Sequence, residues 1–526
     1  MQGVDRHTSG APPDADRGWP QYSGTAFLDT PGCVALTVRE SAVSIPGMRM
    51  IVASAALSTV LVACGHVVSP PPAPDGTLRA PVVEAWVTTG DRARLLSREP
   101  DLQVGTAANV GALVIDVDPA TRYQEMVGFG AALTDASSSL LTNLPRARRD
   151  SVLRSLFGRD DGIGLSFMRV PMGASDFSSR HYSYDDVPAG ETDFPLAHFS
   201  IAADRADKLP VLKQALAINP QLRLVASPWS APAWMKTGGS LMQGTLRPEA
   251  YDVFARYFQR FIQAYAAEGV PIFAVTMQNE PAFEPPDYPG MRLDPATRAA
   301  VIGRHVGPLF ARAGIPALIF EWDHNWDLPA QPLAVLADSA ARRYVSGVAW
   351  HCYAGEVSAQ EMVHAAYPDK DAYFTECSGG AWAPNFADNL KWTVSTLVIN
   401  SVRHWARGVA LWNLALDETG GPHLGGCGNC RGVITIHSRT GAVTPNEEYY
   451  ALAHASRFVR PGAHRIASST GMGGLQSVAF RNADDGSRVV IVVNTAAADV
   501  TFTVREASNA VTYALPAGAV VTFRWR

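Results

Sequence analysis

A helix, a strand and an acid follow one another in AYDVFARYFQRFIQAYAAEGVPIFAVTMQNEP, residues 250–281. In its first half apolar side chains recur at helical spacing, at Phe254, Tyr257, Phe258, Phe261, Ile262 and Tyr265. This spacing predicts an amphipathic helix, and Gly269 is a typical stop. The nearly continuous apolar run 271–277 then predicts a parallel strand buried on both faces. The strand delivers Asn279 and Glu280 to its carboxyl end, where Pro281 turns the chain away.

Seven more apolar runs of strand length lie between residues 125 and 415, separated by helical patterns or helix-length gaps. The eight predicted strands are Val127–Ala131, Ile163–Val170, Leu222–Ser227, Ile272–Met277, Ala317–Phe320, Gly347–His351, Ala372–Thr375 and Val409–Asn413. Eight β/α repeats in one region are what a (β/α)8 barrel requires. A doubly wound open sheet is the alternative, but no G-x-G-x-x-G follows the first predicted strand. The fold class we predict is therefore α/β, with a TIM barrel.

Short β-branched runs separated by turn residues flank this region on both sides. They predict an antiparallel β-sandwich side domain, built from both flanks of the barrel. We expect its N-terminal strands in residues 77–120, the catalytic barrel in 121–455 and the C-terminal strands in 456–526.

The N-terminal region carries a targeting pattern. The stretch MRMIVASAALSTVLVACG, residues 48–65, has a basic start, small apolar residues and a lipobox-like end at Cys64. It predicts a secretory signal, because it is too short for a comfortable membrane span of ~20 residues. With the Pro-rich linker 69–76, residues 1–76 are expected to be leader, signal and linker. We expect a bacterial protein outside the cytoplasm, with either a lipid anchor at Cys64 or a cleaved, soluble chain.

Four further cysteines lie in the predicted barrel. Cys427 and Cys430 form a C-x-x-C in a Gly-rich loop, which favours a local disulfide over zinc outside the cytosol. Cys352 and Cys377 end apolar runs and are predicted to be small buried thiols. The net charge of −5 does not favour a nucleic-acid partner.

Two acids stand at the ends of predicted strands on opposite sides of the barrel mouth, Glu280 and Glu376. Functional groups of TIM barrels gather at these strand ends. Paired carboxyls are what glycosidic bond cleavage requires, since one protonates the leaving oxygen while the other attacks the anomeric carbon. The structural alternative is that each acid is solvated or paired with an arginine. A metallohydrolase would need a fuller ligand set than His351 and Asp323, so we predict neither a metal nor a cofactor.

Several longer motifs carry a family resemblance. They are GFGAALTDAS (128–137), RVPMGASDFSSRHYSY (169–184), SPWSAPAWMKTGG (227–239), VTMQNEP (275–281), FTECSGG (374–380) and LWNLALDETGGP (411–422). In this order they resemble glycoside hydrolase family 30, which includes the glucosylceramidases, over nearly all the chain after residue 80. The resemblance implies a (β/α)8 barrel with a β-sandwich side domain, in agreement with the strand pattern.

The resemblance also implies roles for residues at the strand ends. Glu280 would be the acid/base and Glu376 the nucleophile. Asn279 would bind the sugar 2-hydroxyl. Arg169 would orient the nucleophile, and His351 would support it from behind.

Other positions match the family's sugar-binding residues. Asp176 and Trp229 match positions that contact glucose hydroxyls in the glucosylceramidases. Trp412 matches the aromatic floor of the sugar subsite, and Tyr353 would lie beside the nucleophile. These residues imply a small-molecule, oligosaccharide or glycolipid substrate.

The function we predict is a retaining β-glucosidase of the glucosylceramidase type. An endo-β-1,6-glucanase is the alternative, because EWDHNWD (321–327) is similar to bacterial and fungal family members, some of which resemble such enzymes. The C-x-x-C insertion is a second departure from the lysosomal glucosylceramidase pattern. A non-catalytic carbohydrate-binding barrel is the alternative of a different class, and the presence of both acids argues against it.

Overall fold

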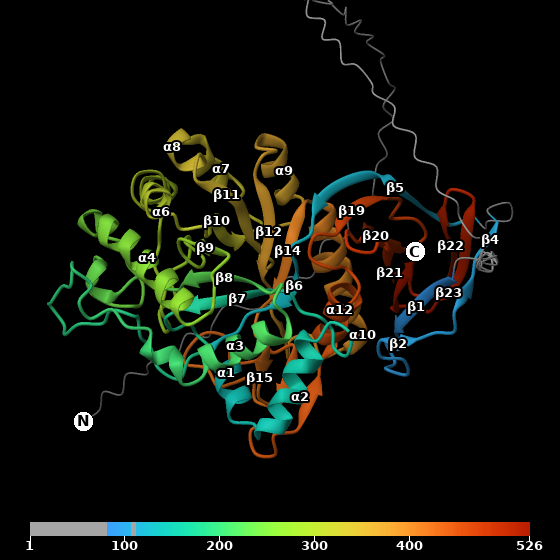
Figure 1. Cartoon of the computed structure of the whole chain (residues 1–526), viewed down its shortest axis with the longest axis horizontal. Coiled ribbons are helices and arrows are strands. Elements are labelled where there is room, and N and C mark those ends of the chain that lie inside the picture. The colour runs from blue at the N-terminus through green and yellow to red at the C-terminus, as the bar shows by residue number, and fades with distance from the viewer. Residues whose placement is uncertain (1–81, 107–111) are drawn as a thin grey trace, which may run out of the picture. The chain divides into compact units, whose positions relative to one another are not determined.

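Eight parallel strands form one sheet of the computed structural model, and they correspond to the eight apolar runs of the sequence (Figure 1). The strands are β6 (Gly128–Ala131), β7 (Phe167–Met172), β8 (Arg223–Pro228), β9 (Ala274–Thr276), β10 (Leu318–Asn325), β11 (Val345–His351), β12 (Asp371–Glu376) and β14 (Ala406–Leu411). Their order is β6-β14-β12-β11-β10-β9-β8-β7. The outermost two approach each other, since Leu133 N donates to Arg169 O at 2.8 Å. The predicted barrel is therefore confirmed, and its sheet is nearly closed.

The structure describes residues 82–106 and 112–526, which belong to the unit Thr77–Arg526. The predicted leader, signal, linker and anchor at Cys64 lie outside the described residues. Within the described ranges, no helix combines the length and the apolar character that a membrane crossing requires.

Two strand boundaries differ from the sequence prediction because the backbone leaves the extended region. The strand predicted from Ile163 begins at Phe167, since Gly164 has a φ of 66°. β10 runs past Phe320 to Asn325 through an irregularity at Trp322 and Asp323, whose φ values are 73° and 61°. These left-handed positions aim side chains out of the regular alternation of a strand.

Helices follow the strands and cover the outside of the barrel (Figure 1). They are α1 (Asp135–Thr142), α2 (Arg146–Phe157), α3 (Lys208–Ile218), α4 (Tyr251–Ala267), α5 (Pro295–Ala300), α6 (Gly307–Ala313), α7 (Ala330–Ala337), α8 (Ser339–Arg342), α9 (Ala359–Ala366), α10 (Phe386–Trp392), α11 (Ser401–Arg403) and α12 (Glu447–Ser456). Two π-helical segments, 301–306 and 393–400, join α5 to α6 and α10 to α11. α4 buries its predicted apolar face, and Gly269 follows it with a φ of 79°.

Strands from both flanks form the side domain (Figure 1). From the N-terminal side come β1 (Val82–Thr88), β2 (Ser97–Arg98), β3 (Leu102–Gln103), β4 (Gly105–Thr106) and β5 (Val114–Glu125). From the C-terminal side come β19 (His464–Ser468), β20 (Leu475–Arg481), β21 (Arg488–Asn494), β22 (Val500–Glu506), β23 (Asn509–Leu515) and β24 (Val520–Trp525). β1 pairs with β24, and β5 lies between β19 and β22. The side domain predicted from both flanks is therefore confirmed.

A buried histidine joins the barrel to the side domain. His454 of α12 hydrogen bonds through Nδ1 to Thr522 Oγ1 and through Nε2 to Thr88 Oγ1, each at 2.9 Å. Burial lowers the pKa of His454 to about 3, so its imidazole is neutral. Arg403 of α11 adds a second link by donating to Ser477 O at 2.5 Å.

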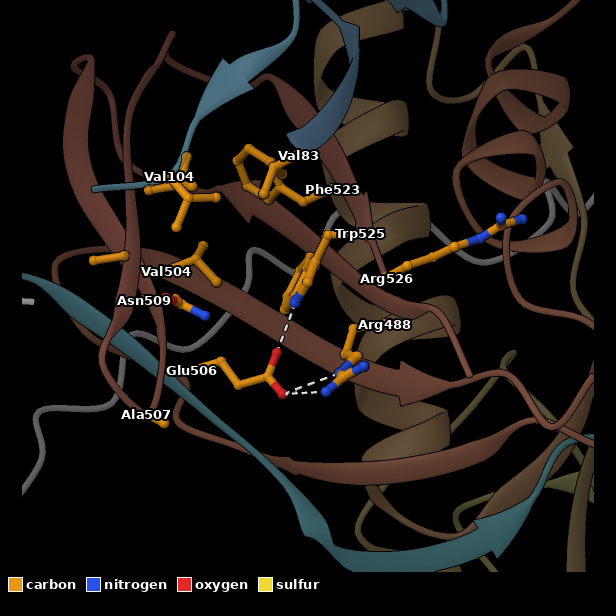
Figure 2. A pocket seen from close by; sticks show the side chains of 12 residues that line it. Val83, Val104, Arg488, Val504, Glu506, Ala507, Asn509, Phe523, Trp525 and Arg526 are labelled. Atoms are coloured by element: carbon orange, nitrogen blue, oxygen red, sulfur yellow. Dashed lines mark hydrogen bonds and ion pairs between the residues drawn. The ribbon is translucent and has the colours of Figure 1, made fainter. Parts of the chain in front are cut away.

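The side domain contains a cavity of about 170 Å³ (Figure 2). Val83, Val504 and Phe523 form part of its apolar wall. On its polar side, Glu506 accepts hydrogen bonds from Arg488 and from Trp525 Nε1. Because these groups satisfy one another, they hold the edge of the sandwich together.

Candidate active site

Glu280 and Glu376 face one small volume at the carboxyl ends of β9 and β12. One carboxylate oxygen from each, together with a ring nitrogen of His351, lies within 4.8 Å of the others. The Glu280 side chain is 14% exposed and that of Glu376 is 7% exposed. The structure thus brings together two acids that are far apart in the sequence.

Beneath this pair lies Asp323, which is fully buried in β10. Its two oxygens accept hydrogen bonds from five side chains: Arg169, Ser227, Thr276, His351 and Thr375. Burial opposes the charge on Asp323, but Arg169 and His351 outweigh it and hold the pKa of the carboxyl well below its usual range. Asp323 is therefore a fixed negative charge at the centre of the site.

Arg169 of β7 connects Asp323 to the acid pair. Its Nη1 donates to Glu376 Oε2, and its Nη2 donates to Asp323 Oδ2 and Asn279 Oδ1, both at 2.6 Å. The planar guanidinium suits such a set of acceptors, because its donors lie in a rigid fork. It also lies 4.7 Å from the ring centroid of Trp229. Arg169 thereby fixes one oxygen of Glu376 and the amide of Asn279.

His351, at the end of β11, bridges Asp323 and Glu280. Its Nε2 lies 3.1 Å from Asp323 Oδ1, and its Nδ1 lies 3.1 Å from Glu280 Oε1. Burial works against the imidazolium, but the charge of Glu376 and the bonds to Asp323 and Glu280 raise the pKa of His351 to about 9. A protonated imidazole donates from both nitrogens, which matches its two acceptors.

The two acids respond differently to these neighbours. Burial raises the pKa of Glu376, and His351 and Arg169 offset only part of that rise. Burial also acts to raise the pKa of Glu280, but the hydrogen bond from His351 and the charges of His324, His351 and Arg169 together outweigh it, so the pKa is lowered. Because the acids interact so closely, they take up protons as a pair.

Three residues at the ends of the barrel strands have a left-handed backbone conformation. Glu280 has a φ of 48°, Asp323 a φ of 61° and Asn413 a φ of 63°. Such positions cost about 1–3 kcal/mol each and persist only where the surroundings hold them. Glu280 N donates to Asp323 O at 3.0 Å, which ties the two strained residues together.

The predicted sugar-binding residues surround the acid pair. Trp229 and Trp412 stack with their ring centroids 5.0 Å apart. Asp176 is buried, and burial and the charges of Glu376 and Glu280 raise the pKa of its carboxyl. Tyr353, which is 46% exposed, donates from its hydroxyl to Glu376 Oε1 at 3.0 Å.

Sequence reasoning assigned no role to three residues of this site. Asp323 was placed at the end of a predicted strand, but it was considered there only as part of an incomplete metal-ligand set. His324, the next residue in EWDHNWD, has its Nε2 3.9 Å from Glu280 Oε1. Tyr288 lies beside Trp229 and Trp412, and burial and the charges of nearby acids raise the pKa of its phenol.

The prediction that Cys352 and Cys377 are free thiols is wrong, because the structure joins them in a disulfide. Their Cα atoms are 5.5 Å apart, as disulfide geometry requires. The cause is the register of two neighbouring strands: His351 of β11 pairs with Glu376 of β12, so the next residues face each other. The bond therefore lies directly beside two residues of the site.

A second disulfide, Cys427–Cys430, closes a loop that lies against the sugar-binding side. Leu424 N of this loop donates to Asp176 O at 2.8 Å. Gly426 has a φ of 65°, and an added Cβ would lie 2.5 Å from Cβ of Asp176. The chain then pairs through β16 (Cys430–Arg431) with β13 (Gly379–Gly380), shortly after Glu376. The loop thus forms one wall of the site.

One cluster in the described part of the chain has the geometry to hold a metal ion, and it consists of Glu280, His351 and Glu376. Arg169 already donates to Glu376, and His351 already contacts Asp323. These two positive groups repel a cation and supply the charge balance that a metal would otherwise give.

Two carboxyls facing each other across the mouth of a TIM barrel, with stacked indoles beside them, define an O-glycosyl hydrolase. The chain belongs to glycosyl hydrolase family 30. Residues 126–459 match the TIM-barrel domain of this family, and residues 462–523 match its β-sandwich domain. The family resemblance expected from the motifs is thereby confirmed, and the substrate is a glycoside.

Relatives within the family carry different names. The endo-1,6-β-D-glucanase of Neurospora crassa is 36% identical over 415 residues, which cover 76% of this chain and 85% of the relative. The lysosomal acid glucosylceramidase of Mus musculus is 30% identical over 459 residues, which cover 82% and 87%. A solved endo-β-1,6-glucanase structure matches with a TM-score of 0.78 and 32% identity, covering 84% of this chain and 99% of that one.

Proposed function

We propose that this enzyme hydrolyses β-1,6-linked glucosyl bonds and retains the configuration of the anomeric carbon. The observation that carries the mechanism is the separation of the acids, whose nearest oxygens lie within 4.8 Å. Retaining enzymes place their carboxyls ~5–5.5 Å apart, whereas inverting enzymes leave ~6.5–9.5 Å for a water molecule. The short separation favours direct attack by one carboxylate.

Glu376 is the nucleophile in this proposal. Arg169 and Tyr353 each donate to one of its oxygens, so the carboxylate is oriented on both sides. It attacks the anomeric carbon, the bond to the leaving oxygen breaks, and a glycosyl ester forms. Arg169 stabilises the negative charge until the ester neutralises it.

Glu280 is the acid and then the base. One proton is shared along the hydrogen bond of 3.1 Å between His351 Nδ1 and Glu280 Oε1. When the proton is on His351, Glu280 is a carboxylate, and when the proton moves to Glu280, His351 is a neutral imidazole. Glu280 gives a proton to the leaving oxygen, and His351 is placed to support that transfer. In the second step Glu280 takes a proton from water, which attacks the anomeric carbon and releases Glu376.

The choice of glucan rests on relatives and on the rim of the site. The matching endo-1,6-glucanases are 36% identical in sequence and 32% identical in the solved structure, against 30% for the mouse glucosylceramidase. The stretch EWDHNWD at the end of β10 also favours this choice. A glucosylceramidase is the second candidate, supported by the motifs around Asp176, Trp229 and both acids.

Four substrates distinguish these candidates: β-1,6-glucan, β-1,3-glucan, an aryl β-glucoside and glucosylceramide. We expect cleavage of β-1,6-glucan, with the β-anomer as the first product in proton NMR. Glu376→Gln is expected to lower kcat by at least about 10³-fold, because it removes the nucleophile while keeping the shape. Hydrolysis of glucosylceramide alone would favour the second candidate, and a first α-anomer would contradict retention.

We also propose that the enzyme works outside the cytoplasm. Two disulfides at the site agree with an oxidising compartment, and the N-terminal pattern agrees with export. A lipid anchor at Cys64 is tested by labelling cells with a palmitate analogue. Label on the wild-type protein that is absent from Cys64→Ala is expected, and an unlabelled wild-type protein would contradict the anchor.

A further inference from the structure

His324 is a buried polar side chain that lies beside the acid/base and takes no part in the proposed chemistry. It belongs to β10, and 9% of its side chain is exposed. Its Nδ1 is enclosed and finds no hydrogen-bond partner among the described residues. Its Nε2 also has no hydrogen bond within the described part of the chain, but it lies towards Glu280 Oε1, at 3.9 Å. Because buried polar groups are normally paired, Nε2 is the nitrogen of this ring that a ligand can satisfy.

The charge state of His324 suits a neutral hydroxyl ligand. Burial lowers its pKa to about 4, although Glu280 acts in the opposite direction. In the neutral ring Nε2 is either a donor or an acceptor, depending on the tautomer, and a sugar hydroxyl can pair with it in both cases. The face of the ring lies 5.1 Å from Trp322, measured between centroids, so this indole limits how far the imidazole can turn away.

The position of His324 relative to the acids indicates which sugar it would contact. Its Nε2 lies 3.9 Å from Glu280 Oε1. His351 contacts this same oxygen at 3.1 Å and lies 3.9 Å from Glu376 as well. His351 is therefore shared by the two acids, whereas His324 lies 3.9 Å from Glu280 and, among the described residues, has no such contact with Glu376. In a retaining mechanism a group beside the acid/base and away from the nucleophile faces the leaving group.

We propose that His324 binds a hydroxyl of the departing glucosyl unit and so selects a sugar over a lipid leaving group. This inference rests on the proposed function. A hydroxyl oxygen can lie ~2.8 Å from both His324 Nε2 and Glu280, because two such bonds meeting at an angle span the 3.9 Å between them. The contact would hold the leaving sugar while Glu280 protonates its oxygen. His351 cannot serve in this way, since both of its nitrogens are engaged.

The test compares His324→Phe, His324→Gln and wild type on two substrates. One is a β-1,6-linked glucose disaccharide, whose leaving group carries hydroxyls, and the other is an aryl β-glucoside, whose leaving group lacks them. We expect His324→Phe to lower kcat/KM for the disaccharide by about 10–100-fold and for the aryl glucoside by less than about 3-fold. His324→Gln, which keeps a donor and an acceptor, is expected to recover part of the loss.

Controls separate this inference from folding and from the proposed function. His305→Phe changes a histidine that contacts Asp252 on the outer helices and is expected to behave as wild type on both substrates. Equal losses on both substrates, or no loss on either, would overturn the role of His324. If His324→Phe does not fold, His324→Ala carries the same comparison. A wild-type enzyme inactive on both β-glucosides would instead overturn the proposed function.

Discussion

Arg169 and Asp323 form a fully buried ion pair, in which Arg169 Nη2 donates to Asp323 Oδ2 at 2.6 Å. The pair positions both acids, since Arg169 continues to Glu376 and Asp323 continues through His351 to Glu280. One buried ion pair thus connects the nucleophile Glu376 with the acid/base Glu280. A change at Asp323 is therefore expected to disturb the positions of both acids, although Asp323 lies beneath them.

Asp323→Asn is expected to weaken both folding and turnover. It leaves Arg169 without its buried partner, and breaking such a pair costs about 3–5 kcal/mol of unfolding free energy. Small displacements of the acids are expected to lower kcat by about 10²-fold. Urea unfolding and steady-state kinetics measure the two effects. Asp101→Asn is the matched control, because it breaks an exposed pair with Arg98 and should cost less than about 1 kcal/mol. A stability loss in Asp323→Asn no greater than in this control would contradict the prediction.

The disulfide Cys352–Cys377 is expected to hold the nucleophile in place. Cys352 lies between His351 and Tyr353, and Cys377 directly follows Glu376. Replacing both cysteines by alanine should lower kcat by roughly 10-fold with little change in KM, because the bond adjoins His351 and Glu376, and a displaced nucleophile affects the chemical step more than binding. Opening a bond between residues 25 apart should also cost about 3 kcal/mol.

The second disulfide provides the comparison for this prediction. Cys427→Ala with Cys430→Ala frees the loop that contacts Asp176, so its main effect should be a higher KM. Kinetics of both double variants, each with its melting temperature, separate the two roles. If the changes in kcat and KM are the same in the two variants, the disulfides stabilise the fold in general and neither has a specific role at the site.

The pH profile is expected to depend on His351, whose pKa is about 9. The imidazolium shares a hydrogen bond with Glu280, so in wild type the basic limb of kcat/KM should lie near pH 9. In His351→Phe, Glu280 must hold the proton alone, and an ordinary buried glutamate loses it at much lower pH. The basic limb should therefore move down by roughly 2 pH units or more. A limb that stays in place would show that His351 does not share the proton.

Much of this architecture could be predicted from the sequence because it depends on local patterns of apolar residues. The apolar runs identified all eight barrel strands, and the face of α4 followed from the spacing of Phe254, Phe258 and Phe261. Glu280 and Glu376 could be brought together because parallel barrel strands present their carboxyl ends at one mouth. These inferences needed only the order of the elements.

The residues that escaped prediction depend on register and backbone irregularity. Asp323 lies at a left-handed position where the pairing of β10 with β11 shifts, so alternation along the strand does not place it inward. The bond between Cys352 and Cys377 depends on a second shift, near His351, where β11 pairs with β12. His324 follows Asp323 directly, so the same register shift determines where its side chain lies. Such local shifts have no periodic signal in a single sequence.

Acid is expected to weaken the contact between barrel and side domain through His454. In the folded protein its pKa is about 3, whereas an unfolded histidine has a pKa of ~6.5. The lowered pKa means that stability is complete above pH ~6.5 and is lost as the pH falls towards 3, because only the unfolded chain takes up the proton there. The full loss is about 5 kcal/mol at the low end. His454→Gln should be less stable than wild type at pH 7 but should lose less on going to pH 4, as measured by urea unfolding. If both proteins lose equal stability between pH 7 and pH 4, His454 is not the acid-sensitive group.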